Sequence, residues 1–391
     1  MSIDVFRAVT MVLMVWVNDF WTLNSIPKWL KHASAGEDYL GFSDFIFPWF
    51  LFVLGMSIPF SFQKRFNNGE SIFSIFKHII LRTVALLVMG LFHMNIEMYN
   101  TESALLAKPI FVIITTSAFF MVWNNYPQGN QKMQKIFTAM RYIGILLLIT
   151  MFLIFIGKDY EGNQIGFRVY WWGILGLIGW VYFISASTFV FIKKSLLGIL
   201  TAFLACLGLN IMSSSGMAYN IFAWQSDHWI PGNGGLQALA FGGIIVSLLL
   251  IKINAKEIIN RLYPILFGFS LVSLLIGLIF RNYFILNKIH GTPTWILISL
   301  SSAILFFVFL HWLIDIQKIT NWYKYIAIAG TSTLTCYLMP YLYYNVTVLS
   351  KLTIPIVLTS GILGLLKSGC YTALIIGFTW WFSKLKIQIK I

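Results

Sequence analysis

The sequence has little charge for its length. Only 10% of its 391 residues are charged, and the acidic side chains number 13 against 27 Lys and Arg. A soluble domain carries about a quarter of its residues charged, so a soluble fold of this length is excluded. The hydrophobic share of 59% and the mean hydropathy of +0.81 instead indicate a polytopic membrane protein.

The sequence also lacks the patterns of several other classes. Its cysteines, Cys206, Cys336 and Cys370, are far apart and match no disulfide framework or metal spacing. The six histidines are scattered and no carboxylate cluster accompanies them, so we predict no metal site. There is no Gly-rich phosphate loop, internal repeat or low-complexity linker, and residues 1–391 are therefore predicted to form a single domain.

Long apolar runs fill most of the chain, and a run of about 20 residues can span a membrane as a helix. They predict an all-α transmembrane bundle of twelve helices, near residues 5–22, 44–62, 79–94, 105–123, 136–157, 170–192, 196–212, 236–253, 262–280, 294–314, 325–347 and 361–383. The last boundary leaves an alternative of eleven helices, because residues 353–366 are also apolar and Lys367 interrupts the run.

The basic residues alternate between predicted loops in a way that indicates topology. With Met1 in the cytoplasm, seventeen loop cations lie inside: Lys64, Arg65, Lys77, Arg82, Lys132, Lys135, Arg141, Lys193, Lys194, Lys252, Lys256, Arg261, Lys318, Lys324, Lys384, Lys386 and Lys390. Seven lie outside: Lys28, Lys31, Lys158, Arg168, Arg281, Lys288 and Lys351. Cytoplasmic loops hold the excess of Lys and Arg, so both termini are predicted to be cytoplasmic. This bias and the anionic lipid headgroups also explain the net charge of +14 without nucleic acid.

A polar stretch, residues 29–38, separates the first two apolar runs, and a very apolar run begins shortly after it. The topology places this stretch on the outer face. Histidine is the side chain best suited to exchange a proton near neutral pH, so His32 and Asp44 supply a base and a group able to orient it. Asp44 has an alternative role as the acid that stabilises the first turn of the second helix.

Two more polar residues, Asn18 and Asp19, end the first apolar run. Polar groups at that position are costly unless they are satisfied, so we expect them to face a wet cavity. There Asn18 is able to donate a hydrogen bond to an oxyanion, and Asp19 is a second candidate for orienting the His32 ring.

Four segments together carry a resemblance to a known family. They are Ser2-Ile-Asp-Val-Phe-Arg7, Val17-Asn18, Lys31-His-Ala-Ser34 and Ser43-Asp-Phe-Ile-Phe-Pro-Trp-Phe50. In order and spacing they resemble the heparan-α-glucosaminide N-acetyltransferase family of transmembrane acyltransferases, and a weaker likeness continues at Arg168, at residues 173–175 and at residues 179–183. The chain departs from the lysosomal members at Gly176-Leu177, Ser332 and Pro340, so it resembles bacterial members most and the acceptor is left open.

The resemblance implies a membrane enzyme that takes an acetyl group from cytoplasmic acetyl-CoA. The acceptor across the membrane would be an amino sugar or another glycan, and His32 matches the family's central catalytic histidine. His32 would either deprotonate the acceptor amine or hydroxyl, or become acetylated itself. The implied location is a bacterial inner membrane, and a homodimer is one option for its assembly.

The basic residues predicted to bind acetyl-CoA are Arg7, Lys64, Arg65, Arg82 and Arg168. Each has a structural alternative. Arg7 is spaced to pair with Asp4 on one helix face, and the cytoplasmic cations also satisfy the topology rule alone.

Two other functions fit the same composition. A transporter or flippase of a sugar- or lipid-linked substrate would explain charges within apolar runs at Lys108, Arg141 and Lys367. A catalytically silent scaffold would leave the polar residues near His32 unexplained.

Overall fold

In the computed structural model, which describes residues 1–192, 195–218, 232–253 and 257–391, nearly all regular structure is helical. The α-helices are α1 (Ser2–Asn18), α2 (Ser43–Asn67), α3 (Ile72–Glu97), α4 (Lys108–Trp123), α5 (Gln131–Leu153), α6 (Ile174–Ile192), α7 (Leu196–Ser214), α9 (Gly235–Lys252), α10 (Tyr263–Phe280), α11 (Pro293–His311), α12 (Ala327–Thr331), α13 (Thr333–Leu349) and α14 (Gly361–Lys384). Two short strands, β1 (Gly157–Lys158) and β2 (Gln164–Ile165), pair antiparallel. The predicted all-α fold class is therefore confirmed.

Nine helical segments of the described ranges are long and apolar enough to cross a membrane, which makes the chain a multi-pass membrane protein. They are Ser43–Asn67, Ile72–Glu97, Gln131–Leu153, Ile174–Ile192, Leu196–Ser214, Gly235–Lys252, Ile258–Phe280, Pro293–Ile316 and Gly361–Lys384. Helix α4 is apolar but shorter, and α1 and α13 each have 17 residues. The count of twelve spans remains a prediction.

Each predicted run overlaps a helix, but several ends differ. Helix α1 stops at Asn18, and a 3-10 turn (Phe20–Thr22) replaces the predicted last turn. Helix α3 begins earlier than expected because the Ser71 side chain caps it by accepting from the backbone N–H of Ser74. The run predicted at 325–347 is divided at Ser332 into α12 and α13.

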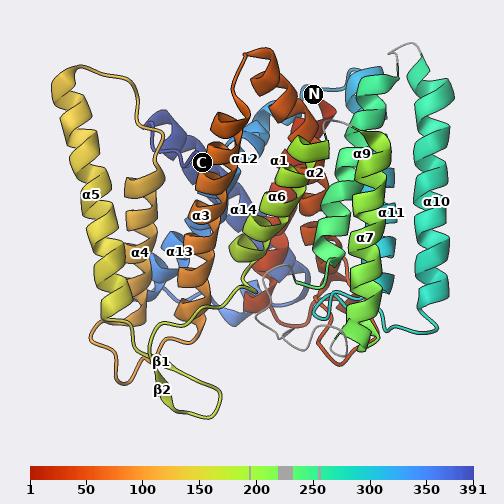
Figure 1. The fold of residues 1–391 in the computed structure, drawn as a ribbon. Coiled ribbons are helices and arrows are strands. Elements are labelled where there is room, and N and C mark those ends of the chain that lie inside the picture. The colour runs from red at the N-terminus through yellow and green to blue at the C-terminus, as the bar shows by residue number, and fades with distance from the viewer. Residues whose placement is uncertain (193–194, 219–231, 254–256) are drawn as a thin grey trace.

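The two ends of the bundle are distinct (Figure 1). Both chain termini lie toward one end, here called the terminal end, and the β1–β2 hairpin lies at the other, here called the hairpin end. Their assignment to the cytoplasm and the outside remains a prediction of the charge count. Three of the cations in that count, Lys193, Lys194 and Lys256, lie outside the described residues.

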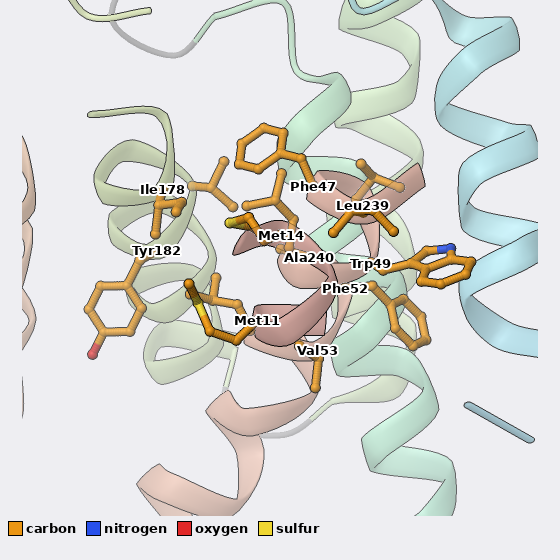
Figure 2. Close-up of a cluster of buried hydrophobic side chains, with 14 of the residues drawn as sticks. Met11, Met14, Phe47, Trp49, Phe52, Val53, Ile178, Tyr182, Leu239 and Ala240 are labelled. Carbon is orange, nitrogen blue, oxygen red and sulfur yellow. The ribbon is translucent and has the colours of Figure 1, made fainter. Parts of the chain in front are cut away.

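Helix α2 runs through the core and packs along α9, α1 and α11. Glycine lets α2 and α9 approach closely: a Cβ on Gly55 would lie 1.9 Å from the carbonyl oxygen of Ala240, and one on Gly243 would lie 2.0 Å from that of Phe52. Figure 2 shows part of the apolar core that surrounds this contact. The packing fixes the position of α2, whose first turn carries Asp44.

Candidate active site

The loop between α1 and α2 lies at the hairpin end and is held by residues distant in sequence. The side-chain amide of Asn287 donates to the carbonyl oxygens of Ser34 at 2.8 Å, Ala35 at 3.2 Å and Glu37 at 2.9 Å. The backbone N–H of Leu286 donates to Asp38 Oδ1 at 2.7 Å. These bonds dock the loop on the connection between α10 and α11.

Charge within the loop adds to its order. Backbone and side-chain hydrogen bonds from Ser34 and Lys28 lower the pKa of Glu37 to about 2, so this carboxylate stays ionised at neutral pH. The Lys28 ammonium lies 2.9 Å from Glu37 Oε1. Both side chains are exposed, so the pair orders the loop without adding much to overall stability.

His32 and Asp44 form a hydrogen-bonded pair at the end of this loop. His32 Nδ1 lies 2.7 Å from Asp44 Oδ1, while Asp44 Oδ2 accepts from the backbone N–H groups of Ala33 at 3.0 Å and Gly41 at 3.1 Å. Asp44 is fully buried, whereas the His32 side chain is 41% exposed. An ionised carboxylate only accepts hydrogen bonds, so a bond from His32 to Asp44 places the ring proton on Nδ1 and leaves Nε2 as the nitrogen able to accept a proton.

Lys288 completes the cluster and is a residue that the sequence analysis missed. Its Nζ lies 3.2 Å from His32 Nδ1 and 3.8 Å from Asp44 Oδ1. Burial lowers the pKa of Lys288 below the usual lysine value, and the Asp44 carboxylate opposes that shift. Lys288 is 256 positions from His32, and its only signal in the sequence is its place among the predicted outer cations.

Asp19 serves a different network from the one predicted. Lys367 Nζ lies 2.9 Å from Asp19 Oδ2, Tyr344 donates to Oδ1 at 2.5 Å, and the Ser368 hydroxyl donates to Oδ2. This buried cluster joins α1 to α13 and α14. The structure therefore pairs the His32 ring with Asp44, and Asp19 binds Lys367 instead.

Asn18 lines a cavity of 390 Å³ toward the hairpin end. The other polar residues around it include His93, Glu97, Tyr341 and Asn345. His93 stacks on Tyr341 with 4.0 Å between ring centroids. The lining residues of this cavity do not include His32, so the structure does not bring Asn18 and His32 to one surface.

A larger cavity of 1060 Å³ lies toward the terminal end, and Arg7, Lys64 and Arg82 line it together. Arg7 donates to Ser57 Oγ at 2.6 Å and contacts Asp4 at 3.3 Å. The Arg82 guanidinium lies 4.5 Å from the centroid of the Tyr182 ring. Three of the five predicted donor-binding residues thus share one basic cavity.

The other two predicted donor-binding residues are elsewhere. Arg65 pairs with Glu70 at 2.8 Å and does not line the large cavity. Arg168 is exposed beside the hairpin. Its backbone N–H donates to Asn95 Oδ1 at 2.9 Å, and its carbonyl oxygen accepts from Asn95 Nδ2 at 2.8 Å. The five residues therefore do not form one site.

The two cavities meet in the interior of the bundle. Met11, Met14 and Tyr337 line both of them, so these side chains form the wall between the cavities. Figure 2 shows the two methionines beside the buried aromatic and aliphatic side chains of the core. The small cavity thus extends from the hairpin end, and the large cavity from the terminal end, to the same wall of Met11, Met14 and Tyr337.

The sequence matches the family described as a domain of unknown function (DUF5009) over residues 1–248. The chain belongs to this family. A shorter segment, 98 residues, is 34% identical to heparan-alpha-glucosaminide N-acetyltransferase of Homo sapiens, and 97 residues are 32% identical to the Mus musculus enzyme of the same name. Each match covers 24% of this chain and 13% of the relative. The predicted resemblance is thereby confirmed for part of this DUF5009 chain.

Proposed function

We propose that this protein is an integral-membrane acetyltransferase. It would move an acetyl group from cytoplasmic acetyl-CoA to an amine or hydroxyl of an amino sugar or glycan on the other side of a bacterial inner membrane. The arrangement of the two cavities carries the proposal: a basic cavity from one end meets, at a wall of three side chains, a cavity from the end where His32 and Asp44 lie. The partial similarity to two N-acetyltransferases supports the same chemistry.

The donor would bind in the large cavity. Arg7, Lys64 and Arg82 provide cations for the phosphates of CoA, which form strong charge-assisted hydrogen bonds. The pantetheine arm would extend toward Met11 and Met14. Methionine side chains are unbranched and flexible, so they are suited to move aside for a thioester.

The acceptor would react at the hairpin end. His32 Nε2 takes the proton as the amine or hydroxyl attacks the thioester carbon, the carbon–sulfur bond breaks, and CoA leaves as the thiolate. Asp44 stabilises the imidazolium that forms, and Asn18 donates to the oxyanion. Both groups must act on one carbonyl, so the loop that carries His32 has to approach the mouth of the small cavity during the reaction. Acetylation of His32 itself uses the same neutral ring.

A transporter would use the same two cavities without breaking a thioester, so thioester cleavage separates the two functions. We expect the purified protein to release free CoA thiol from acetyl-CoA when an acceptor is present. We also expect calorimetry to show tighter binding of acetyl-CoA than of adenosine, because adenosine lacks the phosphates. Heats equal to buffer for acetyl-CoA, together with substrate flux in proteoliposomes, would favour the transporter.

The remaining parts of the proposal are a single domain, cytoplasmic termini and a location in the inner membrane. The described residues give the homodimer option no support.

A further inference from the structure

The segment after α14 folds back along the terminal end of the bundle. Residues 385–391 pair with the end of α4, where Ile389 bridges to Asn124. The backbone N–H of Gln388 donates to Asn124 Oδ1 at 2.7 Å, and the Gln388 carbonyl oxygen accepts from the N–H of Asn125 at 2.8 Å. We call residues 385–391 the strap.

A second set of bonds fixes the strap to α12 and α13. The backbone N–H of Ile389 donates to Thr335 Oγ1 at 3.0 Å, and the Gln388 side chain donates to Ser332 Oγ at 2.5 Å. On the α4 side, the backbone N–H of Lys390 also donates to the carbonyl oxygen of Trp123 at 3.2 Å. The strap is thus bonded to the end of α4 on one side and to Ser332 and Thr335 on the other, and Ile389 is buried between them.

This anchoring places Lys390 in the lining of the large cavity, between Ile389 and Ile391. Within the described ranges, Lys390 has no ion pair within 4.0 Å, whereas Arg7 pairs with Asp4 and Arg65 with Glu70. A strap that only closed the end of α4 would not need a cation in the lining of the cavity. Lys386 on the same strap is also exposed but does not line the cavity.

We propose that the strap is part of the donor site and that Lys390 binds a phosphate group of the donor. The inference rests on the proposed function for the identity of that donor, acetyl-CoA. The hydrogen bonds of Gln388 and Ile389 hold the backbone so that the Lys390 ammonium adds to the positive field of Lys64 and Arg82 around the cavity.

The test compares two lysines of one strap in the purified protein. Calorimetry should show that Lys390→Ala weakens acetyl-CoA binding by roughly tenfold, the loss expected for one charge-assisted phosphate contact. Lys386→Ala should change it less than twofold, and Lys390→Arg should restore most of the affinity. Acetyl-pantetheine, which has no phosphate, should bind the wild type and Lys390→Ala equally.

A third variant tests the anchoring. Asn124→Ala keeps the cation but removes a bond that positions the strap, and it should also weaken acetyl-CoA binding. This inference alone would be overturned if Lys390→Ala and Lys386→Ala bound acetyl-CoA with equal affinity. It would also be overturned if Lys390→Ala lost as much affinity for acetyl-pantetheine as for acetyl-CoA. A wild-type protein that does not bind acetyl-CoA would overturn the proposed function and this inference with it.

Discussion

At the scale of single residues, the pair of His32 and Asp44 is the part of the candidate site that the sequence indicated most directly. His32 lies on the loop before α2 and Asp44 in the first turn of α2, only 12 positions apart, so chain connectivity favours their proximity. Lys288 and Asn287 could not be predicted in the same way, because they reach the loop from the connection between α10 and α11. Only tertiary packing brings them there.

His32→Ala should lower acetyl transfer by roughly 10² to 10⁴, the contribution of a positioned general base, while acetyl-CoA binding stays close to wild type. Asp44→Asn should cost less, because it weakens the orientation of the ring and leaves the base in place. Turnover assays with calorimetry of the same samples measure both quantities. Wild-type turnover in His32→Ala would contradict the mechanism, and a misfolded His32→Ala would make the histidine structural.

Lys288 should become reactive at a lower pH than Lys28. Burial lowers the pKa of Lys288, whereas hydrogen bonding to Glu37 raises that of Lys28. Only the neutral amine reacts with acylating reagents, so labelling of Lys288 should reach half its maximum at the lower pH. Competitive labelling with mass spectrometry measures the two midpoints independently of access. Identical midpoints would show that the Lys288 ammonium is not destabilised by its surroundings.

At the scale of elements, the ion pair of Asp19 and Lys367 ties the end of α1 to α14 across 348 positions. Asp19 is fully buried and the Lys367 side chain is 16% exposed. Removing one partner of such a pair leaves the other charge uncompensated, which is more costly than losing the pair as a whole. The pair therefore holds Asn18, which is the last residue of α1 and precedes Asp19, at the small cavity.

Lys367→Met should destabilise the protein by about 3 kcal/mol, because it leaves the Asp19 carboxylate unpaired. The double variant Asp19→Asn with Lys367→Met should recover part of that loss. Thermal unfolding in detergent ranks the variants, with Arg281→Met as the control, since Arg281 pairs with Asp38 at the exposed surface. A double variant less stable than Lys367→Met would show that the hydrogen bonds of Asp19 matter more than its charge.

The sequence predicted the positions of the helices better than their ends. Apolar length alone identifies a membrane helix, because a helix satisfies its own backbone in lipid. The ends depend on local contacts, as at Ser71, whose side chain begins α3, and at Ser332, where α12 and α13 separate. The Asp19 network was not predictable because its partners come from two other helices.

At the scale of the whole molecule, the charge bias predicts which end faces outward. A cysteine at Ser34, on the loop at the hairpin end, should react with an impermeant thiol reagent on intact cells. A cysteine at Asn67, at the end of α2, should react only after permeabilisation. Both positions are exposed, and the exposed Cys370 should first be replaced by serine to remove its signal. The reverse labelling pattern would put His32 in the cytoplasm and end the need for transfer across the membrane.

Asn287 docks the α1–α2 loop from a distant part of the chain, which affects how the sequences of related proteins can differ. The family match ends at residue 248, so it includes His32 and Asp44 but not the connection that holds their loop. A relative that keeps the first part and changes residues 281–292 would retain the proposed base while altering how its loop is held. The proposed base and the contacts that position its loop would then evolve on separate stretches of the chain.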